Sequence, residues 1–132
     1  MENAVLDSYA ILTFLFKEQG HEIIINLFDQ AVEKDKALLI AAPNWAEVRY
    51  IVERRFGANQ WSEVRTKLLG LPLKVIDTDQ DLAEEAGAIK AKHKMSLADC
   101  FAAALAKHKK GKLYTGDPEF KAMEKELQIV WL

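Results

Sequence analysis

The chain has 132 residues, about the length of one domain, and half of them are hydrophobic. Its 18 lysines and arginines nearly balance its 20 aspartates and glutamates, so the composition excludes a uniformly basic nucleic-acid binder and a disordered chain. A single cysteine, Cys100, excludes an internal disulfide and a cysteine-based zinc site. The apolar run at 8–16 lacks a basic leader and is too short to span a bilayer, so we expect a soluble protein of the cytoplasm.

Short aliphatic or β-branched runs, typical of strands, alternate along the chain with stretches of helical periodicity. The first run is Ala4–Leu6, and runs at 37–41 and 73–76 follow it, each separated from the next by an apolar stripe of helical spacing. A weaker run at 112–115 and a last one at 129–132 complete the set. This alternation predicts an α/β domain whose parallel five-stranded sheet is covered by helices.

Three acidic residues stand where such a sheet places ligands, just beyond the carboxyl ends of its strands. Asp7 follows the first predicted strand, Asp117 follows the fourth, and Glu47 opens the helix after the second. Each also has a purely structural interpretation. Asp7 and Asp117 fit helix N-caps, with Pro118 at the first helical position, and Glu47 fits a capping box with Asn44.

A fourth acid, Asp99, is the only charge in the apolar run at 97–106, which predicts a buried helix. Ser96 is a candidate cap for this helix, with Asp99 as the acidic member of a capping box. A buried carboxylate is otherwise costly unless it is paired or bound to a metal. Clusters of carboxylates alone suit Mg²⁺ or Mn²⁺, and two such ions about 4 Å apart can hold the attacking and leaving oxygens of a phosphoryl displacement.

With these residues in place, the chain resembles the PIN-domain family, and in particular the VapC-type toxin ribonucleases of bacterial and archaeal toxin–antitoxin pairs. The resemblance covers the whole chain. It rests on four segments, the last two of which are the most specific: Val5-Leu6-Asp7-Ser8, Glu47, Ser96-Leu97-Ala98-Asp99 and Thr115-Gly116-Asp117-Pro118-Glu119-Phe120. Tyr9 is bulkier than the residue expected at its position.

The resemblance implies a single three-layer α/β/α PIN domain over residues 1–132, with the activity of an Mg²⁺- or Mn²⁺-dependent endoribonuclease. It implies an RNA product with a 5′-phosphate and one with a 3′-hydroxyl. It also implies a homodimer that a cognate antitoxin protein holds inactive. The expected catalytic and metal-binding acids are Asp7, Glu47, Asp99 and Asp117, and the expected ligand-positioning residues are Ser8 and Thr115.

Two other functions stay open from the sequence. A phospho-acceptor receiver domain has a similar length, and Asp77 ends the third predicted strand, where a phosphorylated aspartate would lie. A non-catalytic partner-binding module would use its acids only as helix caps and its apolar surface to bind another chain. The candidate anchors are Phe14, Trp45 and Trp61, although aromatic residues at helical spacing are more often core residues. We read Asp77 and Asp79 as caps of the following helix, although the sequence leaves open whether they join the acidic site.

The near-neutral net charge conceals a basic stretch between residues 90 and 112. This stretch carries seven lysines and one acid, Asp99. Such a run is usually a solvated surface. Because these lysines flank the helix that carries Asp99, a second interpretation is that they contact the phosphate backbone of a nucleic acid around a metal-filled acidic pocket.

Overall fold

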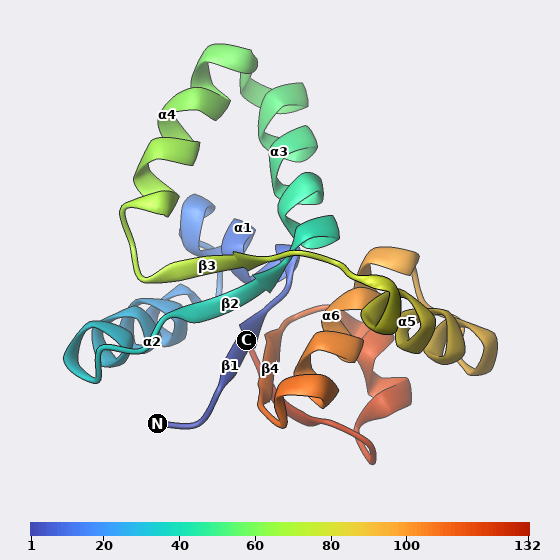
Figure 1. Cartoon of the computed structure of the whole chain (residues 1–132). Helices are drawn as coiled ribbons and strands as arrows, with labels where there is room; N and C mark the ends of the chain where they lie inside the picture. The colour runs from blue at the N-terminus through green and yellow to red at the C-terminus, as the bar shows by residue number, and fades with distance from the viewer.

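A central sheet of five parallel strands, with helices on both faces, organises the computed structural model, which describes residues 1–132 (Figure 1). All four strand pairings are parallel, which confirms the predicted three-layer α/β/α class. The observed strands lie within one residue of the predicted runs at either end: β1 (Ala4–Leu6), β2 (Leu38–Ala41), β3 (Leu73–Ile76), β4 (Lys112–Thr115) and β5 (Gln128–Trp131).

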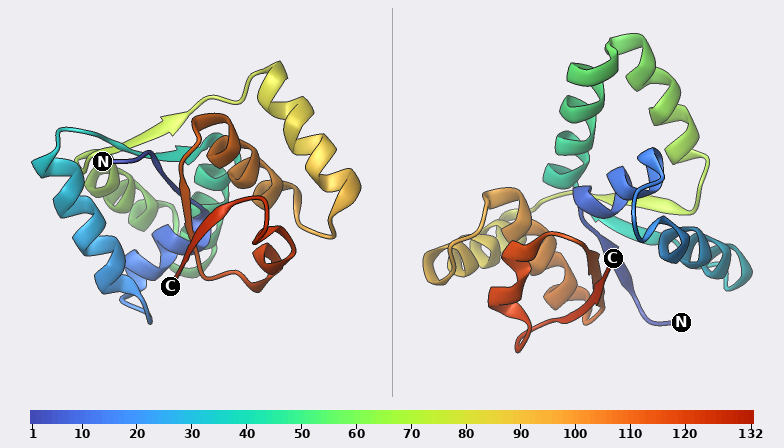
Figure 2. Two further views of the ribbon diagram at one scale, coloured as in Figure 1. Left: turned by 90° about the horizontal axis from the view of Figure 1, so that it is seen from below. Right: turned by 180° about the vertical axis from the view of Figure 1, so that it is seen from behind.

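Two hydrophobic cores form because alternate side chains of a strand point to opposite faces of the sheet. In β1, Val5 belongs to one core, whereas Ala4 and Leu6 belong to the other. The Leu6 side is covered by α1 (Ser8–Phe16), α2 (His21–Glu33), α3 (Ala42–Phe56) and α4 (Ala58–Leu69). The Val5 side is covered by α5 (Gln80–Lys92), α6 (Leu97–Lys109) and the 3₁₀ helix η1 (Pro118–Met123), which stay together in both views of Figure 2.

The strand order is β3-β2-β1-β4-β5. The chain adds β2 and β3 on one side of β1 and then crosses over to add β4 and β5 on the other side, so the strand order reverses between β1 and β4. Ligands bind beside such a reversal in open α/β sheets, and these two strands lead into Asp7 and Asp117. The same order excludes a receiver domain, whose sheet runs 2-1-3-4-5 with the third strand inside. Here β3 is an edge strand, so Asp77 lies at the margin of the sheet and the receiver interpretation is wrong.

The aromatic residues proposed as anchors of a binding module are core residues. Trp61 is buried, and the Trp45 ring packs edge-on against it at 5.3 Å between centroids. Phe14 packs against Phe28 at 5.1 Å within the core beneath α1 and α2. These three side chains therefore stabilise the fold and leave no anchor surface of the kind expected. None of the helices is both long enough and apolar enough to cross a membrane.

Candidate functional site

Asp7 is fully buried at the junction of β1 and α1. Its Oδ1 accepts the backbone N–H of Ala10 at 2.8 Å, so Asp7 is the N-cap of α1, as one interpretation of the sequence held. Its Oδ2 accepts the hydroxyl of Thr115 at the end of the neighbouring strand β4. Burial raises the pKa of Asp7 to about 7 against the lowering effect of these two hydrogen bonds, and the charges of Asp117 and Glu47 add to the rise.

Asp99 lies in the first turn of α6 and is also buried. Ser96 caps this helix by accepting the backbone N–H of Asp99 at 3.2 Å, as predicted. Burial raises the pKa of Asp99, and the carboxylates of Asp117 and Asp7 raise it further. None of the ion pairs in the protein includes Asp7, Asp99 or the half-buried Asp117, so no lysine or arginine offsets the cost of burying the charges of Asp7 and Asp99.

Carboxylate oxygens of three residues, Asp99, Asp117 and Glu119, lie within 4.8 Å of one another. Asp117 is the N-cap of η1, because its Oδ1 accepts the backbone N–H of Glu119 at 3.0 Å. Glu119 belongs to the motif at 115–120 but is not one of the four predicted metal-binding acids. Its Oε2 accepts the N–H of Ser96 at 3.0 Å. The two residues are 23 positions apart, so no local sequence motif predicts this contact.

Glu47 lies on α3, where its two carboxylate oxygens accept hydrogen bonds from Ser8 and from Tyr50, the latter at 3.1 Å. The predicted capping box with Asn44 is wrong. Because Pro43 occupies the first turn, α3 begins at Ala42, and Asn44 is buried inside the helix. The Asn44 side chain instead donates to the carbonyl of Ala98 at 3.2 Å, which ties α3 to α6 beside Asp99.

The structure thus places the four predicted acids at the carboxyl edge of the sheet, with Asp7 joined to β4 through Thr115 and Glu47 joined to α1 through Ser8. Asp79, by contrast, caps α5 by accepting the N–H of Leu82 at 2.9 Å, as expected. The prediction that Asp77 is also a cap is wrong, because Asp79 alone is the N-cap of this helix. The candidate metal ligands of this site are all carboxylate oxygens, and none of them forms an ion pair with a lysine or arginine. This donor set fits a hard divalent cation such as Mg²⁺ or Mn²⁺.

Only part of the predicted basic stretch lies near this site. Lys90 donates to the carbonyl of Met95, just before α6, whereas the lysines at the end of α6 lie far from the acids. Lys112 pairs with Ala4 at the amino end of the sheet, opposite the acids. Lys107 lies eight residues after Asp99 on α6, or about 12 Å along the helix axis. Lys107 and Lys112 face Glu85 and Glu2, each at 3.7 Å. The lysines at the end of α6 therefore lie at the far edge of the molecule, because a helix that starts at the site carries its last turn away from it.

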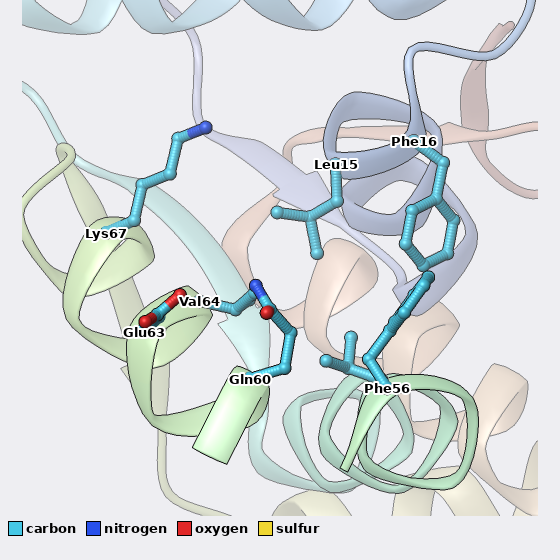
Figure 3. Close-up of a pocket in the computed structure, with 8 residues that line it drawn as sticks. Leu15, Phe16, Phe56, Gln60, Glu63, Val64 and Lys67 are labelled. Carbon is cyan, nitrogen blue, oxygen red and sulfur yellow. The ribbon is translucent and has the colours of Figure 1, made fainter. Parts of the chain in front are cut away.

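An apolar groove of about 480 Å³ lies between α1, α3 and α4 (Figure 3). Phe16 and Phe56 form one side of it, with ring centroids 5.8 Å apart, and Phe56 is 54% exposed. None of the site acids lines this groove. Its lining residues are Leu15, Phe16, Val52, Phe56, Gln60, Glu63, Val64 and Lys67.

Comparison with known proteins points to one family. The family model described as PIN domain matches residues 4–126, which is nearly the whole chain. No curated protein sequence matches.

Several solved structures with the same fold are described as toxins or as toxin–antitoxin complexes. The VapBC complex of Salmonella typhimurium, bound to DNA, is 20% identical with a TM-score of 0.77, over 98% of each chain. A toxin–antitoxin complex of Klebsiella pneumoniae is 22% identical with a TM-score of 0.70, over 97% of this chain and 96% of that one. VapC20 of Mycobacterium tuberculosis, a toxin that cleaves the sarcin–ricin loop, is 18% identical with a TM-score of 0.72, over 91% of this chain and 94% of that one.

Proposed function

Because the chain belongs to the PIN domain family, we propose that it is a metal-dependent endoribonuclease, the toxin of a type II toxin–antitoxin pair. One observation carries the proposal. Oxygens of Asp99, Asp117 and Glu119 converge within 4.8 Å beside the buried Asp7, and no protein cation balances them. Asp99 is buried, Asp117 is half-buried and Glu119 is exposed. Carboxylates this close repel one another, so binding of a divalent cation should stabilise the folded protein as well as serve the reaction.

The proposed ligands are the four acids predicted from the sequence together with Glu119. A bound Mg²⁺ or Mn²⁺ supplies positive charge at the phosphoryl oxygens and acidifies the attacking water. The residues of the chain hold this arrangement. Thr115 and the N–H of Ala10 fix both oxygens of Asp7, and each carboxylate oxygen keeps a second lone pair for a ligand. Ser8 and Tyr50 fix Glu47 in the same way.

In the proposed hydrolysis, the oxygen of water bonds to phosphorus, the bond from phosphorus to the 3′-oxygen breaks, and a proton passes to that leaving oxygen. The products are a 5′-phosphate and a 3′-hydroxyl. Preorganised carboxylates matter because they hold the reactants in line without reorganising during the reaction.

The direct test incubates the purified protein with total cellular RNA and Mg²⁺, with and without EDTA, and maps the ends of the fragments. We expect metal-dependent cleavage that leaves 5′-phosphates. Asp99→Asn keeps the shape of the side chain and should lower the rate by a factor on the order of 100 or more. Equal cleavage by Asp99→Asn, or cleavage that EDTA does not affect, would contradict the proposed site.

The proposed protein partner is a cognate antitoxin, since similar structures are complexes of toxins with antitoxins. The groove between α1, α3 and α4 fits an apolar face of such a partner, because it is open and exposes Phe56. The expected homodimer remains a prediction, which sedimentation velocity of the purified protein would test.

A further inference from the structure

Two exposed tyrosines flank the acidic site. Tyr9, on α1, is 45% exposed and lies two residues after Asp7. Tyr50, on α3, is 43% exposed and donates its hydroxyl to Glu47. Large aromatic side chains are costly to leave in water, so two of them beside one catalytic cluster indicate a binding surface.

The ring of Tyr9 is held against the protein backbone rather than in a core. A Cβ at Gly116 would lie 2.2 Å from Cε1 and 2.7 Å from Cζ of Tyr9, so only glycine admits the ring at this distance. Gly116 stands between Thr115 and Asp117 in the turn that carries the site. No protein group hydrogen-bonds the Tyr9 hydroxyl. The ring is therefore held against Gly116, while nearly half of the residue stays exposed and offers surface for stacking on a nucleic-acid base.

Tyr50 belongs to a stripe on α3 that leads away from the acids. Glu47, Tyr50 and Arg54 are spaced by three and four residues, so they lie on one face of the helix. The guanidinium of Arg54 lies 4.8 Å from the Tyr50 ring centroid and pairs with no carboxylate, whereas Arg49 pairs with Glu53 at 3.0 Å. Arg54 is thus an unpaired cation about 10 Å along the helix from Glu47.

We propose that Tyr9, Tyr50 and Arg54 form a track for single-stranded RNA that leads out of the acidic site. The two rings stack on unpaired bases that flank the cleaved phosphate, and Arg54 pairs with a phosphate farther along the strand. The charges favour this occupant, because an arginine that is free of carboxylates and held on an aromatic ring suits a phosphate backbone next to a stacked base. A base pair within a helix offers no free face to Tyr9, so the track selects unpaired RNA. This inference rests on the proposed ribonuclease activity.

Steady-state cleavage of a short single-stranded RNA tests the track. Tyr9→Ala and Arg54→Ala should each raise KM roughly 5- to 100-fold, the range expected for loss of one stacked base or one close phosphate contact, with a smaller change in kcat. Tyr9→Phe keeps the ring and should keep KM. Tyr50→Phe also keeps the ring, but it removes the hydrogen bond to Glu47, so it should lower kcat while KM stays near the wild-type value. Arg65→Ala, an exposed arginine of α4, is the matched charge control. Unchanged KM in both Tyr9→Ala and Arg54→Ala would overturn the proposal.

An RNA that lacks the base next to the cleaved phosphate separates stacking from a general effect on the fold. Removal of this base, tested on either side of the cleaved phosphate, should raise KM for the wild-type protein but add little to the defect of Tyr9→Ala, since the two changes delete the same contact. Equal penalties in both proteins, at both positions, would show that Tyr9 does not stack on that base and would overturn its role.

Binding of a fluorescein-labelled single strand to the Asp99→Asn protein separates this inference from the proposed reaction. In one outcome, the wild-type protein cleaves no RNA, the Asp99→Asn protein binds the strand, and the double variant with Tyr9→Ala binds it more weakly. The track then stands and the proposed hydrolysis is wrong. If the wild-type protein cleaves RNA and Tyr9→Ala binds as tightly as its parent, the hydrolysis stands and the track is wrong. Equal competition by a duplex of the same sequence would also overturn the track.

Discussion

Glu119 accepts the backbone N–H of Ser96 at 3.0 Å, so a carboxylate of the candidate metal cluster also closes the first turn of the helix that carries Asp99. This contact completes what the sequence suggested as a capping box within α6. Ser96 caps the helix as expected, but the reciprocal acceptor for its N–H comes from η1 and not from Asp99. Structural capping and the acidic site therefore share residues, and neither interpretation excludes the other.

Substitutions of Glu119 separate its two roles. Glu119→Ala should remove the acceptor for the Ser96 N–H and lower the free energy of unfolding by about 1 kcal/mol, as for a lost helix cap. Glu119→Gln keeps an acceptor and should retain most of that stability, yet both variants should bind Mn²⁺ more weakly. Urea unfolding in EDTA and calorimetric titration with Mn²⁺ provide the two readouts. Glu124→Gln, at an exposed acid of the same segment, is the control. If Glu119→Ala and Glu119→Gln both bind Mn²⁺ as tightly as the wild-type protein, Glu119 is not a metal ligand.

Stability without metal should depend on pH through Asp7. Its pKa is raised from 3.8 to about 7 in the folded protein, so between these values the folded state binds more protons than the unfolded state. The free energy of unfolding therefore falls as pH rises from about 4 to about 7. Asp7→Asn, which keeps the N-cap acceptor, should remove the part of this loss that Asp7 causes and stabilise the metal-free protein by about 1 to 3 kcal/mol near pH 8. Asp99, whose pKa is also raised, keeps its own contribution to the loss.

Urea unfolding in EDTA at acidic and alkaline pH measures this dependence. Asp29→Asn, an exposed aspartate of α2, is the control and should leave the pH profile unchanged. Saturating Mg²⁺ should oppose the loss, because a cation bound to the folded state favours the ionised carboxylates. A profile for Asp7→Asn as steep as that of the wild-type protein would contradict the assigned burial of this charge.

Thr115 supports two acids at once. Its hydroxyl donates to Asp7 and accepts the N–H of Asp117 at 3.0 Å. Thr115→Val keeps the shape but leaves that N–H without a partner, so it should lower the free energy of unfolding by about 1 to 3 kcal/mol. It should also raise the pKa of Asp7 further, since the hydrogen bond from Thr115 lowers it. Thr115→Ser should restore both properties, and rates of RNA cleavage across pH will show whether the acidic limb moves upward only in the valine variant.

The apolar groove is expected to serve the antitoxin and not the RNA. Phe56→Asp places a charge on its exposed wall and should weaken binding of the cognate antitoxin at least about tenfold, because the charge must be desolvated on binding. Cleavage of RNA by the free protein should remain at the wild-type rate. Val32→Asp, an exposed apolar position on α2 outside the groove, is the matched control. Loss of antitoxin binding in both variants, or in neither, would place the interface elsewhere.

Most of the fold could be predicted because local periodicity reports burial directly. The strand-like runs at Ala4–Leu6 and Leu73–Ile76 match the observed strands, and the acids follow them as parallel topology requires. The predicted start of α3 at Asn44 is wrong because Asn44 resembles a cap residue, whereas Pro43 lies in the first turn and the helix begins at Ala42. The burial of Asn44 against Ala98 depends on where α6 packs, which no local pattern contains.

The sequence by itself determined the elements, their class and the acidic residues at the ends of β1 and β4, since side-chain period and chemical type are properties of the chain alone. Tertiary structure decided which segments meet. Because of the strand order, Asp77 follows an edge strand. Because α6 starts at the acidic site, its final lysines lie at the opposite edge of the sheet. Glu119, on η1, lies at the start of α6. These outcomes depend on packing between segments that are distant in the sequence. The position of each helix end depends on how the helix packs on the whole sheet, which no local pattern contains.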